Sequence, residues 1–137
     1  MIAQGMTTSF KEELLEGVHD LTTDVVKIAL YTANADLGAD TTIYTTVEEI
    51  SSANYVAGGV VMTGVTVSKS GTTAYVGFNN VSWVPAGFTA RGALIYNSSK
   101  GNKSIAVLDF GSDITGSPNF VVQMPVATAS DALLRIV

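Results

Sequence analysis

His19 is the only histidine of the chain, and it is the first residue to consider for acid–base or nucleophilic chemistry. A Ser-His-Asp triad would place it between an activated serine and an orienting carboxylate. His19 stands beside Asp20, directly after a segment with helical spacing. A histidine in that place usually interacts with the negative end of the helix dipole. The sequence therefore favours a structural role for His19.

Carboxylates are the second group with possible chemistry. Glu12, Glu13 and Glu16 belong to one short helical segment, where they complement the helix N-terminus and form a solvated face. Asp109 and Asp113 lie on either side of a glycine, but calcium loops need several oxygen ligands in a defined pattern that is absent here. Asx-turn hydrogen bonds are therefore their favoured role.

A glycosidase needs only two carboxylates at a suitable separation in space, so a hydrolase stays an open alternative. Such an enzyme would show two close carboxylates in a cleft and would lose activity when either is removed. Nothing in the sequence points to that pair. We predict a non-enzymatic protein with no catalytic, cofactor-binding or metal-binding residues and no cofactor.

Arg91 lies within an apolar run that includes Ala90 and Leu94. A charge among apolar neighbours needs an oppositely charged partner. The run belongs to an expected β-hairpin, Phe88–Gly111, whose two apolar arms are joined by a polar turn. We predict that Arg91 pairs with Asp109 on the other arm.

Aromatic side chains could line a sugar-binding groove, and the candidates are Trp83, Phe88, Tyr96 and Phe110. All four lie in or beside apolar segments with strand character. Aromatic residues in such segments dominate protein cores and subunit contacts. The sequence therefore favours packing over glycan binding for these residues.

Composition limits the class of protein. The chain has 137 residues, which suits one domain (1–137) with a sizeable core, and it has no cysteine for disulfides or thiolate metal sites. Its net charge of −5, with scattered basic residues, argues against a nucleic-acid partner. No apolar stretch is long enough for a membrane helix, and no secretory signal is present, so we expect synthesis in a cytoplasm and no membrane partner. Only 14% of residues are charged, which favours a protein that works in an assembly.

The spacing predicts one short N-terminal helix, residues 9–17, which Ser9 and Glu12 cap as a capping box and which Gly17 ends. A strand, Val25–Tyr31, follows with clean alternation. The polar segment Thr32–Ser52 is expected to hold one helical turn around Val47–Ile50, capped by Thr45 or Thr46.

From residue 60 onward strands and turns alternate about every 8–12 residues, after a breaker at residues 57–59. This rhythm favours an antiparallel β-sandwich or a jelly-roll-like barrel, so the fold class is mainly β with one short N-terminal helix. The expected strands are Val60–Ser68, Thr73–Phe78, Val81–Val84, Ala90–Asn97, Ser104–Phe110, Phe120–Pro125 and Ala132–Val137.

Five segments together resemble a family of small structural proteins of tailed bacteriophages: Ser9–Asp20, Val26–Tyr31, Ala57–Gly59, Phe88–Gly111 and Pro125–Val137. The resemblance implies a virion component, most like a capsid decoration (cement) protein. Such a protein binds the outside of the mature capsid and reinforces contacts between capsid subunits. The implied partners are the major capsid protein and other copies of this chain, in a homotrimer. The implied location is the capsid exterior, after synthesis in the host cytoplasm, and the family offers no catalytic motif to transfer.

An alternative within the same particle is a tail, baseplate or fibre module that binds a host receptor or glycan. That role predicts an exposed aromatic cluster. For the decoration role, we expect the short helix and Thr32–Ser52 to contact neighbouring molecules while the later strands form the core.

Overall fold

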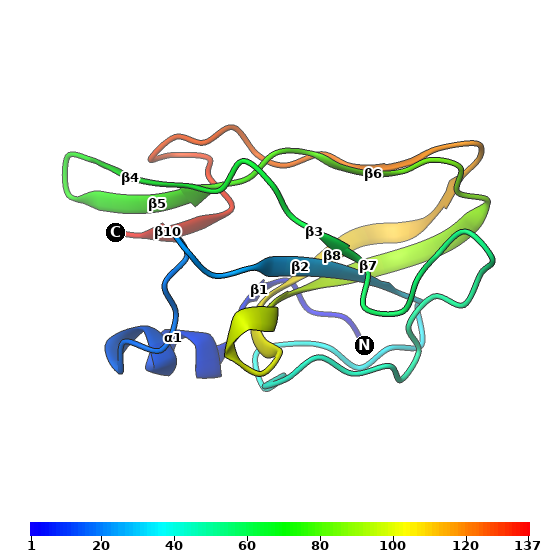
Figure 1. Cartoon of the computed structure of the whole chain (residues 1–137), viewed down its shortest axis with the longest axis horizontal. Coiled ribbons are helices and arrows are strands. Elements are labelled where there is room, and N and C mark those ends of the chain that lie inside the picture. Colours follow the sequence, from blue (N-terminus) through cyan, green and yellow to red (C-terminus); the bar gives the residue numbers. More distant parts are fainter.

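The structure is a computed structural model that describes all residues from Met1 to Val137. Its strands form antiparallel sheets in two layers, with one short helix below them (Figure 1). The larger sheet has the order β1-β8-β7-β2-β3. Its strands are β1 (Gly5–Met6), β2 (Val26–Tyr31), β3 (Val60–Val61), β7 (Phe88–Asn97) and β8 (Lys103–Gly116).

The second layer consists of a three-stranded sheet with the order β10-β5-β4 and the pair β6-β9. Its strands are β4 (Thr66–Ser70), β5 (Thr73–Gly77), β6 (Val81–Trp83), β9 (Phe120–Val122) and β10 (Leu134–Ile136). The two layers pack face to face, so the predicted fold class, mainly β with antiparallel sheets and one short helix, is confirmed in the form of a sandwich.

The main core fills the space between the layers. Ile28, Ile95 and Ile105 of the larger sheet are fully buried there. Trp83 and Phe120 enter from the second layer. Alternation along each strand directs these side chains inward.

The opposite face of the larger sheet is also buried. Ala29, Tyr31 and Leu94 project from that face, and Ala35 and Leu37 from the loop after β2 cover them. Figure 1 shows this loop, in cyan, beneath the sheet. Thr32–Ser52 therefore builds part of the core together with the later strands, a contribution that the sequence did not predict. A role of this segment in contacts with neighbouring molecules stays a prediction for its exposed residues.

Helix α1 (Thr8–Leu15) begins one residue earlier than predicted, because its N-cap is Thr7. The Thr7 hydroxyl accepts a hydrogen bond from the Phe10 amide at 3.3 Å. Thr7 is itself fixed by the sheet, since its amide donates to the Ile105 carbonyl at 3.0 Å. The predicted capping box is therefore wrong, and the Ser9 hydroxyl instead lies against Ser104, at 3.3 Å.

The end of α1 is as predicted. Gly17 has a left-handed φ of +74°, which glycine adopts without steric cost. Its amide donates to the Leu14 carbonyl at 3.2 Å, and the Val18 amide donates to the Glu13 carbonyl at 2.9 Å. These two bonds form a Schellman motif, which satisfies the last carbonyls of the helix.

Several strand limits differ from the predicted ones. The expected strand Val60–Ser68 is interrupted at Gly64, whose φ of +64° turns the chain from β3 in one layer to β4 in the other. Strand β8 continues past Phe110 to Gly116, because a bulge opposite Arg91 absorbs the extra residues. The two-residue strand β1 was not predicted, and β6, β9 and β10 are shorter than expected.

The predicted helical turn around Val47–Ile50 is a tight turn instead. Glu48 has a positive φ of 63°, which no helix accommodates, and the Glu49 amide donates to the Thr46 carbonyl at 3.2 Å. Thr45 does accept a hydrogen bond from the Val47 amide, at 3.1 Å. No helix of the chain has the length and apolarity needed to span a bilayer.

Candidate functional site

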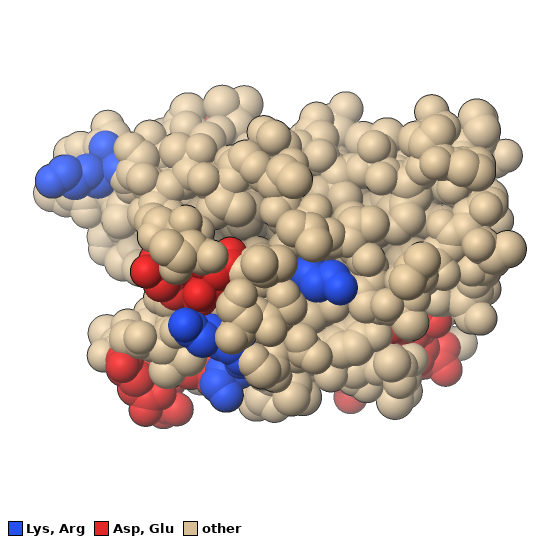
Figure 2. Space-filling view, viewed as in Figure 1, with Lys and Arg blue, Asp and Glu red and all other residues tan.

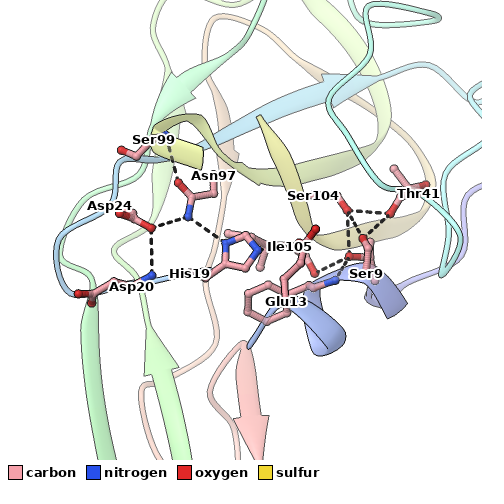
Figure 3. A network of polar contacts seen from close by, with 12 residues as sticks. Ser9, Glu13, His19, Asp20, Asp24, Thr41, Asn97, Ser99, Ser104 and Ile105 are labelled. Atoms are coloured by element: carbon pink, nitrogen blue, oxygen red, sulfur yellow. Dashed lines mark hydrogen bonds and ion pairs between the residues drawn. The ribbon is translucent and has the colours of Figure 1, made fainter. Parts of the chain in front are cut away.

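His19 lies inside a polar network rather than on the surface (Figure 3). Its side chain is fully buried, with Nε2 at 2.9 Å from Glu13 Oε1 and Nδ1 at 2.9 Å from Asn97 Nδ2. The amide nitrogen of Asn97 is only a donor, so Nδ1 accepts and Nε2–H donates to Glu13. Both ring nitrogens therefore bind structural partners. The sequence predicted an interaction of His19 with the end of the helix, and it did not reveal the hydrogen bond to Glu13.

The network continues from Asn97 to a nearly buried carboxylate, Asp24. Asp24 Oδ2 accepts hydrogen bonds from Asn97 Nδ2 at 2.8 Å and from the Asp20 amide at 3.0 Å. The Lys100 ammonium lies 3.3 Å from Asp24 Oδ1. Burial raises the pKa of Asp24, but these donors and the lysine outweigh burial and leave the pKa lowered. The network ties the loop after α1 to the end of β7.

We expect Asp24→Asn to weaken the acid dependence of folding. A carboxyl whose pKa is lowered in the folded state stabilises the fold above its unfolded pKa, about 3.9, and loses this contribution as the pH falls. At pH 7 the substitution is expected to cost about 1–3 kcal/mol, because a buried acceptor is replaced by an amide that opposes two donors. Urea midpoints at pH 3 and pH 7 test this.

The control for Asp24→Asn is Asp113→Asn, at an exposed aspartate outside the network. Its midpoints are expected to follow the wild type at both pH values. Equal midpoint losses for the two variants at pH 7 would contradict the assigned role of Asp24.

Four tyrosines gather around Glu49 and attach the loop 32–52 to the larger sheet. The hydroxyls of Tyr44 and Tyr55 donate to the two Glu49 oxygens at 2.5 and 2.6 Å, and the Gly58 amide donates to Oε2 at 2.8 Å. Tyr96 donates to the Gly58 carbonyl at 2.6 Å. Burial, together with the nearby Glu49 charge, raises the pKa of Tyr96 to about 12. The remaining tyrosine, at position 31, donates to the Thr45 carbonyl.

The predicted pair of Arg91 and Asp109 is confirmed, with Arg91 Nε at 3.2 Å from Asp109 Oδ1. Asp109 also accepts a hydrogen bond from the Gly111 amide at 2.9 Å, as an Asx turn requires. The Gly111 amide and then Arg91 hold the pKa of Asp109 below its usual value. Both side chains are about one-third exposed, so this pair adds little stability.

The four aromatic candidates are mostly core residues. Trp83 and Phe88 are buried between the layers in an edge-to-face contact of 6.3 Å. Tyr96 is buried on the other face of the larger sheet, where it stacks on Tyr44 at 4.8 Å. Phe110 is half-buried and packs on Phe120 at 6.0 Å. Their predicted packing role is confirmed.

The surface features that the sequence did not reveal are two apolar hollows. The first, which we call the helix groove, lies between α1 and the β10-β5-β4 sheet and has a volume of about 250 Å³. Phe10 and Leu14 line it from the helix. On the sheet side an inner cross-strand row of Val67, Val76 and Leu134 lines it. In the next row, which we call the outer row, Ala74 and Ile136 line the groove and Lys69 lies beyond its edge.

The second hollow, which we call the uncharged trough, has a volume of about 490 Å³ and no charged residue in its lining. Phe110, Ile114 and Val121 line it from β8 and β9, and Met124 and Leu133 close its sides. Ile114 and Val121 are exposed. The signal in the sequence is the absence of any charge between Asp113 and Asp131.

Charged side chains are unevenly distributed on the surface. Figure 2 shows them near α1 and the neighbouring end of the molecule, while a broad area on the opposite side carries few. Exposed apolar areas such as those in the helix groove and the uncharged trough usually mark contacts with other molecules. The two apolar hollows are therefore the candidate functional sites of the chain. The chain matches no known family model, no curated protein and no solved structure.

Proposed function

We propose that this protein is a structural, non-enzymatic component of a tailed-phage particle. It binds the outside of the mature capsid as a decoration protein and reinforces contacts between capsid subunits. Its partners are the major capsid protein and other copies of itself, arranged as a homotrimer on the capsid exterior. The resemblance of five of its segments to phage structural proteins motivates this assignment.

The uncharged trough is the observation that carries the proposal. Its lining joins apolar side chains of β8 in the larger sheet to Val121 and Val122 of β9 in the second layer. Both strands also contribute residues to the main core, which makes the support rigid. An apolar surface on a rigid support suits binding to a repeated, preformed partner surface, since little conformational entropy is lost. A contact of standard size buries about 1,600 Å² in total. Many such contacts over one shell multiply a modest affinity per site.

Binding to expanded shells that lack this protein tests the proposal. We expect co-sedimentation that saturates at one copy per repeated shell site. Val121→Asp is expected to weaken binding at least about tenfold, because docking would bury an unpaired charge. The matched control is Val61→Asp, which changes an equally exposed valine of β3 outside both hollows.

Two results would count against the capsid role. The first is the absence of binding to shells, and the second is equal binding by the Val121 and Val61 variants. Binding to host cells or polysaccharide instead of shells would favour the tail, baseplate or fibre module.

A further inference from the structure

The outer row of the helix groove is an uncovered strip with two apolar residues and one basic residue, Lys69. The inner row ends at the buried Leu134, under the side chains of α1. The outer row extends beyond the helix, and Ile136 within it keeps 57% of its surface exposed. Ala74 and Lys69 of the same row are also exposed. Part of the groove-facing side of the β10-β5-β4 sheet is therefore exposed to solvent.

Leu15, in the last turn of α1, is an apolar side chain that protrudes from the surface and has the size to pack on such a row. It is 92% exposed, although the preceding residue, Leu14, lines the helix groove. Glu12 and Glu16 flank it on the helix surface and are exposed. Lys11 is the one basic residue of the helix, so acidic groups outnumber basic groups around Leu15.

The charges on the two sides of the groove are opposite and unpaired within one molecule. Lys69 of the outer row takes part in none of the four ion pairs of the chain. Glu12 and Glu16 take part in none of them either. A second copy would bring an acidic helix end against this basic row. The surface of the chain is therefore complementary to itself.

We propose that Leu15 of one copy packs on the outer row of the next copy, between Ala74 and Ile136, with Glu12 and Glu16 of the first copy beside Lys69 of the second. This inference rests on the proposed assembly of the protein into a homo-oligomer. Leu15 and the outer row are different surface patches. Each copy therefore contacts one neighbour through its Leu15 and a second neighbour through its outer row. Contacts of that type close into a ring when the rotation between neighbouring copies is a whole fraction of a turn, and the proposed trimer is such a ring.

Sedimentation equilibrium over a range of concentrations tests the contact. The wild type is expected to form one discrete oligomer, and Leu15→Ser is expected to raise its dissociation constant about 30-fold through lost apolar burial. Leu15 is almost fully exposed, so the substitution leaves the fold intact, which circular dichroism and thermal unfolding verify. The matched control, Val61→Ser, alters an exposed valine of β3 away from the groove and is expected to leave the oligomer unchanged.

A charge exchange provides an independent second test. Lys69→Glu is expected to weaken the oligomer, and the triple variant Lys69→Glu/Glu12→Lys/Glu16→Lys is expected to restore it. A wild type that is monomeric, or a Leu15→Ser variant with unchanged mass at every concentration, would overturn the inference. A monomer that still binds capsid shells would overturn this contact while leaving the proposed capsid function in place.

Discussion

Substitution of Gly59 by alanine is expected to abolish or severely reduce folding. A Cβ at this position would overlap the carbonyl group of Ile28 in β2, with its carbon only 2.6 Å away, and would approach the Ala29 Cα to 2.9 Å. These are backbone atoms of a central strand, so no side chain can move aside to make room. Gly59 also has a φ of +77°, which alanine adopts only with strain. The expected loss is more than about 4 kcal/mol of unfolding free energy.

Gly71→Ala is the matched control for this substitution. Gly71 lies in the turn between β4 and β5, has a φ of +60°, and has open space where a Cβ would stand. It therefore shares the conformational strain without the steric overlap, and we expect a loss of only about 1 kcal/mol. Urea unfolding of the two variants separates the two effects. Unfolding free energies within 1 kcal/mol of each other would show that β2 and the 57–59 segment do not pack as described.

Substitution of Glu49 by alanine has the second largest expected effect, a loss of about 3 kcal/mol of unfolding free energy. The substitution removes the acceptor for the hydroxyls of Tyr44 and Tyr55 and for the Gly58 amide. Tyr55 is buried, so its hydroxyl would lose its hydrogen-bond acceptor inside the protein. The Tyr55 hydroxyl also accepts a hydrogen bond from the Leu30 amide at 2.9 Å, so the substitution also weakens the attachment of the central strand β2.

Glu49→Gln tests whether charge or shape matters at this position. Glutamine keeps one acceptor oxygen but places an amide donor against the other donors, so we expect a loss between those of alanine and wild type. Asp113→Ala, at an exposed aspartate in none of the four ion pairs, is the control and is expected to change stability by less than about 0.5 kcal/mol. Thermal unfolding of the variants gives the ranking. A Glu49→Ala variant as stable as Asp113→Ala would contradict the role of the tyrosine cluster.

Local sequence patterns predicted the parts of the fold that depend on local chemistry. Alternation and turn residues located the β7–β8 hairpin and its pair of Arg91 and Asp109, which face each other across neighbouring strands. The C-terminal end of α1 was predicted because only Gly17 suits the left-handed position. Features of this type follow from residues close to one another in the sequence.

Features set by long-range contacts were missed. Thr7 rather than Ser9 caps the helix because β8, about a hundred residues later in the chain, fixes Thr7. The hydrogen bond from the Thr7 hydroxyl to the Ile105 carbonyl joins residues 98 positions apart. The partner of His19 in β7, Asn97, is 78 positions away. The second core depends on a polar segment folding over the far face of the larger sheet, and its few apolar residues, such as Ala35 and Leu37, show no periodicity.

The candidate interaction surfaces were missed for a related reason. Strand β4 alternates Val67 and Lys69 with three hydroxyl residues, which indicates a two-sided strand. The sequence does not reveal that α1 covers one row of this sheet and leaves the next row open. Whether a row of side chains is covered depends on where the neighbouring helix ends in the folded structure. Only the assembled fold identifies it.

The copy number of this chain in purified virions, measured by quantitative mass spectrometry against the major capsid protein, tests the proposed function most directly. The proposal predicts a ratio within a few-fold of the capsid protein. A few copies per particle would contradict a head-covering role and would favour the tail, baseplate or fibre. Complete absence from virions would contradict the assignment to the particle itself.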